Sequence, residues 1–151
     1  KTAASRLKTY IGNSTPVFRA HNNANQIIAN NSDVTVRFNQ EDFDPQSTFN
    51  TSDYKFTPAV AGKYFLTATV RMAAATDGGI NEIYMRKNSA TIASARTNPG
   101  SGNAFAQTIN NVVVADTDDT FHIEIYQNTG GNVNCSGGDT ATFFTGFKLL
   151  E

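Results

Sequence analysis

The sequence predicts an all-β domain, a two-sheet sandwich of about ten short strands. Its 151 residues include 19 Thr, 11 Phe and 5 Tyr, which favour strands, beside 17 Asn and 11 Gly, which favour turns. Turn-forming residues interrupt the apolar segments roughly every 8–12 residues, the spacing typical of sandwiches and barrels. Long stretches of Ala, Leu, Glu and Lys, which would favour helices, are absent.

The first third of the chain contains four expected strands. Residues 17–20 form the first, and residues 34–38 form the second because three apolar side chains alternate there with Thr and Arg. Residues 39–48 are polar and carry Asp-Pro, so a long loop is expected. Residues 49–50 and 54–57 are short strand pieces.

The clearest strand comprises residues 63–72, after a turn at residues 58–62. Its two predicted faces are Tyr64, Leu66, Ala68, Val70 and Met72 on one side and Phe65, Thr67, Thr69 and Arg71 on the other. Residues 81–87 and 90–95 flank Asn88-Ser89, a suitable two-residue hairpin turn.

The last third contains three more expected strands. Residues 104–114 form a long strand after the flexible loop at residues 98–102. Residues 121–126 alternate apolar and polar side chains, and residues 140–150 form the final strand.

We expect one domain, residues 16–151, preceded by a lead-in or stem connection at residues 1–15. The chain begins at Lys1 without Met, and we expect it to be the C-terminal part of a longer protein.

Its net charge of −1 argues against nucleic acid and anionic membrane surfaces as partners. Apolar runs are far shorter than the ~18 residues of a membrane span, so membrane insertion is not expected.

Residues with catalytic or metal-binding chemistry are few. The single cysteine, Cys135, has no partner for an internal disulfide, which fits assembly in a reducing cytoplasm such as a bacterial or viral one. It lies in an expected loop, and a structural thiol is favoured over a nucleophile. Walker and Gly-x-Ser-x-Gly motifs are absent, so no enzymatic activity is expected.

Several carboxylates and one histidine are candidates for metal binding or acid–base chemistry. His122 and Glu124 share one strand face, where two metal ligands could sit, although polar positions on an exposed or inter-subunit face are favoured. The cluster at residues 116–119 could hold calcium, or form a solvated turn. A glycosidase needs a pair of acidic residues that meet in the folded structure, and no sequence pattern identifies such a pair. The candidates are Glu41, Asp42, Asp44 and Asp53. At Asp44-Pro45 a turn is favoured over a catalytic role.

Four stretches in order resemble the globular head domain of complement C1q and the tumour necrosis factor superfamily. Residues 50–66 are similar to the family's middle motif, Asn, Tyr, Phe-Thr, Pro and Gly before Tyr-x-Phe, and residues 144–150 to its closing Phe-Ser-Gly-Phe strand. Residues 86–88 and 119–123 are similar to its Lys-Asn hairpin and its Asp-x-Val-x-Leu strand. Asp118 replaces the family's Gly, and the cysteines of animal members are absent.

Residues 49–62, with Val-Phe-Arg-Ala at residues 17–20, look most like the versions in bacteriophage and prophage structural proteins. There the domain is similar to a receptor-binding tip or cap of a tail fibre. The resemblance therefore implies a place on a virion, or at another extracellular or cell-surface position.

The resemblance implies a ten-stranded jelly roll that forms a homotrimer, with both termini at its base. Apolar side chains on both faces of residues 63–72 and 140–150 suit this arrangement, the alternative being ordinary sandwich core. The expected trimer contacts are Phe65, Phe143, Gly146 and Phe147, with Gly146 allowing close approach of a neighbouring chain.

Loops at the far tip would then carry recognition. They are residues 73–79, 98–103 and 129–139, and the expected hydrogen-bonding contacts are Asp77, Asn98, Asn103, Asn132, Asn134 and Asp139. The expected function is binding of a host cell-surface glycan or protein by a trimeric phage tail-fibre head, without a cofactor. The sequence contains no specific calcium-binding motif. It does not show whether a metal ion lies on the three-fold axis, where each chain would donate only one ligand.

Two alternatives remain open for the function. The domain could trimerise and cap a fibre, with recognition elsewhere. It could also be a secreted bacterial or animal head of the same family that binds a ligand.

Overall fold

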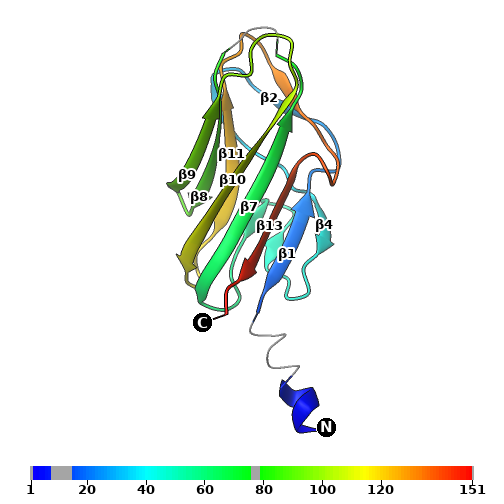
Figure 1. The fold of residues 1–151 in the computed structure, drawn as a ribbon, viewed down its shortest axis with the longest axis vertical. Helices are drawn as coiled ribbons and strands as arrows, with labels where there is room; N and C mark the ends of the chain where they lie inside the picture. The colour runs from blue at the N-terminus through cyan, green and yellow to red at the C-terminus, as the bar shows by residue number, and fades with distance from the viewer. Residues whose placement is uncertain (1, 8–14, 76–78, 151) are drawn as a thin grey trace.

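The computed structural model describes residues 2–7, 15–75 and 79–150. The strands between Val17 and Lys148 form two antiparallel sheets packed face to face, and the C-terminus lies at the same end of the sandwich as the start of the first strand (Figure 1). A single helical turn over residues 3–7 lies in the expected lead-in, where no helix was predicted.

Sheet A has seven strands and sheet B has six. The strands of sheet A are β1 (Val17–His21), β2 (Gln26–Ile28), β4 (Gln40–Phe43), β7 (Gly62–Met72), β10 (Phe105–Ala115), β12 (Val133–Cys135) and β13 (Phe143–Lys148). The strands of sheet B are β3 (Ser32–Thr35), β5 (Phe49–Asn50), β6 (Lys55–Phe56), β8 (Asn81–Lys87), β9 (Ala90–Thr97) and β11 (Phe121–Gln127).

The all-β jelly-roll class is confirmed, but the described residues form thirteen strands rather than ten. Sequence analysis missed three strands: β2 and β12, which pair with each other, and β4, which lies within the expected loop at residues 39–48. The final strand is also shorter than predicted, because residues 140–142 form a turn before β13.

Strand β7 organises sheet A. Along one edge it pairs over its whole length with β10, and along the other it pairs with β13 and then β12. The predicted alternation of its side chains is confirmed, because the face that carries Leu66 and Val70 is fully buried while the opposite face is partly exposed.

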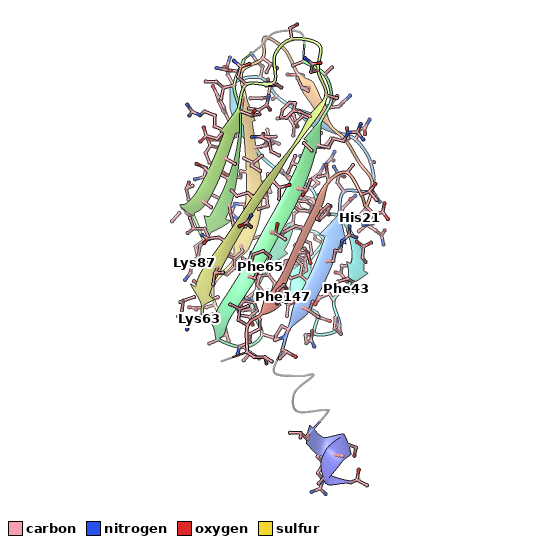
Figure 2. The ribbon with its side chains drawn as sticks, in the orientation of Figure 1. His21, Phe43, Lys63, Phe65, Lys87 and Phe147 are labelled. Atoms are coloured by element: carbon pink, nitrogen blue, oxygen red, sulfur yellow. The ribbon has the colours of Figure 1, made fainter. Side chains whose placement is uncertain are left out.

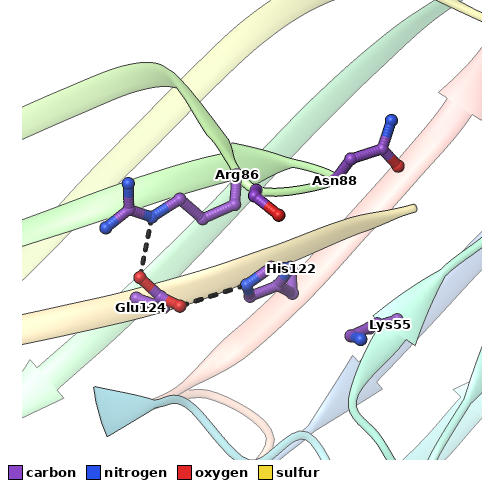
Figure 3. Close-up of a pocket in the computed structure, with 6 residues that line it drawn as sticks. Lys55, Arg86, Asn88, His122 and Glu124 are labelled. Atoms are coloured by element: carbon purple, nitrogen blue, oxygen red, sulfur yellow. Dashed lines mark hydrogen bonds and ion pairs between the residues drawn. The ribbon is translucent and has the colours of Figure 1, made fainter. Parts of the chain in front are cut away.

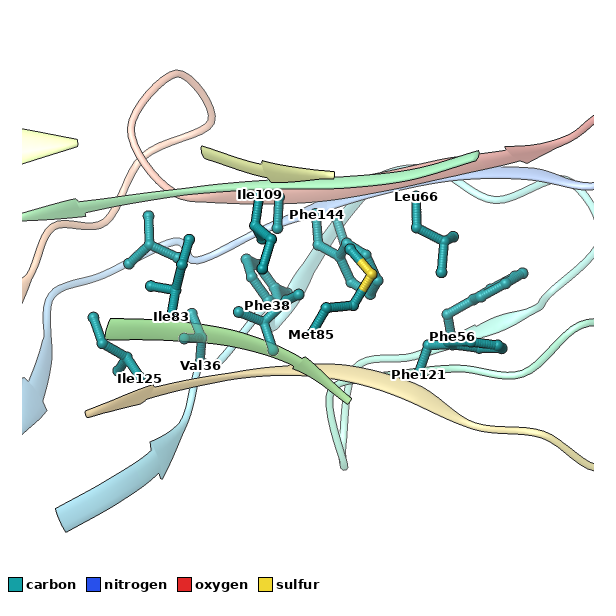
Figure 4. Close-up of a cluster of buried hydrophobic side chains, with 14 of the residues drawn as sticks. Val36, Phe38, Phe56, Leu66, Ile83, Met85, Ile109, Phe121, Ile125 and Phe144 are labelled. Atoms are coloured by element: carbon teal, nitrogen blue, oxygen red, sulfur yellow. The ribbon is translucent and has the colours of Figure 1, made fainter. Parts of the chain in front are cut away.

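The core lies between the two sheets (Figure 4). Its base contains a cluster of aromatic rings in which Phe18 stacks on Phe56 at a centroid distance of 4.5 Å and meets Phe144 edge-on at 5.0 Å. From sheet B, Ile123 and Ile125 of β11 point inward and are fully buried, as their spacing predicted. Because the core takes one face of each sheet, the two outer faces are left for contact with solvent or partners.

Candidate functional site

The outer face of sheet A carries exposed apolar side chains. Five of the seven large hydrophobic residues that are exposed among the described residues lie on it. Ile27 lies on the edge strand β2, and the other four are Phe43, Val112, Val114 and Phe147. The outer face of sheet B carries none of the seven. We call these four residues, together with the half-buried Phe65, the apolar face.

Strand register places three residues of the apolar face in a row across the sheet. Phe65 of β7 is the partner of Val112 on one side and of Phe147 on the other. The rings of Phe65 and Phe147 are 5.5 Å apart and lie beside each other in Figure 2. Two of the expected trimer contacts are therefore brought together on one outer surface, and the alternative that they belong to the sandwich core is wrong.

Charged side chains border the apolar face at β1 and β4. The guanidinium of Arg19 lies 4.8 Å from the centre of the Phe143 ring and forms an ion pair with Asp42. His21 Nδ1 lies 2.9 Å from the Oδ1 atom of the same carboxylate. Phe143 is thus on the expected face, but Arg19 covers it within one chain.

Gly146 requires a correction. A Cβ atom at this position would lie 2.4 Å from Leu66 Cδ2 and 2.9 Å from Phe18 Cε1, both in the core. The residue is glycine because side chains of the same chain fill the space, not because a neighbouring chain needs access to it. We therefore exclude Gly146 from the apolar face.

The described parts of the expected tip loops lie at the end of the sandwich opposite the C-terminus (Figure 1). Within them, Asn98 Oδ1 accepts a hydrogen bond from the Gly100 amide, and Asn103 Nδ2 donates weakly to backbone oxygens of its own loop. These two amides stabilise their loop. Asp77 lies outside the described residues.

The other three expected contacts lie apart from that loop. Asn132 Oδ1 accepts a hydrogen bond from the Asn30 amide, which joins two loops. Asn134 belongs to strand β12 rather than to a loop, and its side chain is exposed opposite Ile27. The carbonyl of Asp139 accepts a hydrogen bond from Arg19, beside the apolar face. The six residues therefore do not form one cluster among the described parts of the chain.

The remaining sequence candidates have structural roles. Cys135 is fully buried, and burial raises the pKa of its thiol, which is unsuited to a nucleophile. Asp44 braces its turn by accepting hydrogen bonds from Thr48 and the Phe49 amide, at 2.9 and 2.7 Å. Residues 116–118 are exposed in a turn, as expected of this cluster, whereas Asp119 is buried and bonded to its neighbours.

His122 and Glu124 share the outer face of sheet B, as predicted, and their side chains contact each other at 3.2 Å. Contrary to expectation His122 is buried, and Lys55 and Arg86 line the same hollow beside it (Figure 3). Lys55 and Arg86 were not predicted as site residues, because they come from separate strands, and the motifs that contain them point to the fold and not to a site. No group of three or more His, Cys, Asp or Glu side chains suited to a metal ion occurs in the described part of the chain.

Comparison with known proteins agrees with this architecture. A family model described as the C1q domain matches residues 17–149. The globular domain of the zebrafish complement 1qA protein superposes with a TM-score of 0.68 at 16% identity, covering 90% of this chain and 98% of that one. Eiger TNF from S. frugiperda gives 0.69 at 10% identity, covering 91% and 94% respectively.

Murine APRIL at pH 5.0 superposes with a TM-score of 0.69 at 14% identity, covering 89% of this chain and 99% of that chain. No curated protein sequence matches. Over the residues described, no helix has the length and apolar character needed to cross a membrane.

Proposed function

This chain belongs to the C1q domain family, and on that premise we propose that it is a non-enzymatic ligand-binding head that assembles as a homotrimer through the apolar face. The observation that carries the proposal is the difference between the two outer faces. Exposed Phe43, Val112, Val114 and Phe147 all lie on sheet A. Soluble monomers rarely leave a contiguous apolar surface of this kind uncovered.

The partner that suits this surface is a second copy of the chain. The implied trimer supplies two neighbours for each protomer, and both of its contact surfaces can come from sheet A and its edge strand β10. Sheet B stays free to face solvent, which agrees with its polar outer surface.

The solution mass tests the assembly. Light scattering behind a sizing column should give about three times 16.3 kDa for the chain. The double substitution Val112→Lys with Phe147→Lys should reduce the mass to that of one chain while leaving the circular dichroism spectrum unchanged. A matched control, Ala90→Lys with Thr117→Lys on exposed positions elsewhere, should leave the trimer intact.

A monomeric mass for the unmodified chain would overturn the trimer. Repeating the measurement with a chelator tests whether a metal ion on the three-fold axis holds the chains together. Dissociation by the chelator would place a metal in the interface, whereas an unchanged mass would mean that the apolar face alone holds the chains together.

We further propose that the trimer binds a host cell-surface glycan or protein through its tip, as the receptor-binding head of a phage tail fibre. The likeness of residues 49–62 to phage and prophage forms supports this assignment, and the location would be the virion. Three weak tip sites would gain strength by acting together. The proposed contacts remain Asp77, Asn98, Asn103, Asn132, Asn134 and Asp139.

A capping and trimerisation role is the second candidate. It is favoured by Asn98 and Asn103, whose amides bond within their own loop instead of being free for a ligand. Alanine substitution of the six contacts distinguishes the two roles. Loss of binding to host cells by an intact trimer supports recognition, whereas full binding supports capping.

A further inference from the structure

A polar hollow of about 330 Å³ opens on the outer face of sheet B (Figure 3). It is lined by Lys55 of β6, Arg86 of β8, the Asn88-Ser89 turn, and His122 and Glu124 of β11. The hollow is separate from both the tip loops and the apolar face. A trimer built through sheet A would leave it open to solvent.

The one carboxylate that lines the hollow, Glu124, already has partners within the chain. Glu124 Oε2 accepts a hydrogen bond from Arg86 Nε at 2.7 Å, and Oε1 lies 3.2 Å from His122 Nε2. Lys55 and Arg86 against Glu124 leave one net positive charge among these three side chains. The hollow therefore attracts an anion rather than a cation.

Three donors in the hollow have no partner among the described residues: Lys55 Nζ, Arg86 Nη2 and the Ser89 hydroxyl. Both polar atoms of the Asn88 side chain, in contrast, have partners, since Oδ1 accepts from Thr120 and Nδ2 donates to Asp119. A surplus of donors over acceptors selects a ligand rich in acceptor atoms.

The Arg86 guanidinium is held in place before any ligand arrives. Its Nε is bound by Glu124, its Nη1 donates to the Thr91 hydroxyl, and its planar group lies 4.8 Å from the centre of the Tyr84 ring. Because these contacts fix the side chain, binding costs little additional ordering. Arginine held in this way suits a carboxylate, which accepts charge-assisted hydrogen bonds.

We propose that this hollow binds the carboxylate of an acidic sugar of the hexuronate type. Lys55 and Arg86 would take the carboxylate, and the Ser89 hydroxyl would bond a ring hydroxyl. A small, open and polar site fits a sugar unit better than an apolar ligand, which needs enclosing apolar walls. The site does not depend on the tip loops or on the trimer.

Nuclear magnetic resonance titration of the whole chain tests the site with glucuronate and glucose, which differ only in the carboxylate. At constant ionic strength, glucuronate should shift the amide signals of Lys55, Arg86 and Ser89, and glucose should not. Acetate should bind more weakly than glucuronate, because it lacks the ring hydroxyls. Absence of shifts, equal binding of glucose, or equal binding of acetate would each overturn the proposal.

Two substitutions localise the effect. Lys55→Gln should weaken glucuronate binding roughly tenfold, the loss expected for one charge-assisted hydrogen bond. Lys148→Gln removes the same charge at the base of sheet A and should leave the affinity unchanged. Ser89→Ala, at an exposed turn position that tolerates substitution, should weaken glucuronate but not acetate. Equal affinity in Lys55→Gln and Lys148→Gln would overturn the assignment.

Discussion

Asp119 holds together the turn that joins β10 to β11. One carboxylate oxygen accepts a hydrogen bond from the Asp116 amide at 2.8 Å and lies 2.8 Å from Lys87 Nζ. The other accepts from Asn88 Nδ2 at 3.0 Å, which ties the turn to the β8–β9 hairpin. These contacts, the Asp116 amide first, hold the pKa of Asp119 below its ordinary value of 3.8.

A lowered pKa makes this contribution dependent on pH. The stabilisation is present above pH 3.8, the pKa of an unfolded aspartate, and is lost as the pH falls through the lower pKa of the folded state. Asp119→Asn should reduce the free energy of unfolding by about 1–3 kcal/mol at pH 7. The difference from the unmodified chain should shrink at pH 2.5. Urea unfolding at one protein concentration measures both, and an equal difference at the two pH values would contradict the argument.

Gly146 gives a second prediction at the scale of one residue. An added methyl group would meet Leu66 and Phe18 at 2.4 and 2.9 Å, so Gly146→Ala should destabilise the fold by about 1–3 kcal/mol through overpacking. Gly131→Ala is the control, because nothing lies within 4 Å of its Cβ position. Urea unfolding should place Gly131→Ala near the unmodified chain, and equal loss in both variants would refute the packing explanation.

Among the elements, the β8–β9 hairpin depends on its turn. Asn88 has a left-handed backbone with φ of 55°, and its Oδ1 accepts a hydrogen bond from the Thr120 amide at 2.9 Å. Sequence analysis predicted this two-residue turn, and the pairing of Lys87 with Ala90 confirms it.

Two substitutions at Asn88 separate the backbone from the side chain. Asn88→Gly loses the side-chain hydrogen bonds but accepts the left-handed conformation, whereas Asn88→Ala loses both advantages. Asn88→Ala should therefore be less stable than Asn88→Gly by about 1 kcal/mol. Thermal or urea unfolding of the pair measures this difference, and the opposite order would show that the turn has changed its backbone.

Element length decided which strands could be predicted. Strand β7 is 11 residues long, and its alternating pattern is visible throughout. Strands β2 and β12 have three residues each, too few to show a period, and β4 is entirely polar except for Phe43. Pairing with distant segments, rather than local pattern, makes these short pieces strands.

The site was predictable to a smaller degree. Outward placement of Phe65 and Phe147 followed from alternation within single strands. The hollow did not, because Lys55, Arg86 and His122 meet only through the pairing of β11 with β6 and β8. Gly146 was misassigned, because the alternation that points Phe147 outward points its neighbour Gly146 toward the core.

At the scale of the whole molecule, the sandwich has two outer faces of opposite chemistry. Sheet A exposes Phe43, Val112, Val114 and Phe147, while sheet B presents the hollow with Lys55 and Arg86. A trimer held by sheet A would bury the first surface and leave the second available three times over. Assembly and acidic-sugar binding would then use separate surfaces, and each could be removed by substitution without the other.

Assembly should also govern apparent stability, because mass action couples folding to association in a trimer. The midpoint of thermal unfolding should rise with protein concentration for the unmodified chain. In the double variant Val112→Lys with Phe147→Lys, which lacks the apolar contacts, the midpoint should be lower and independent of concentration. Differential scanning fluorimetry over a hundredfold range of concentration measures this slope. A midpoint that stays constant in the unmodified chain would mean that the apolar face is not covered by copies of this chain.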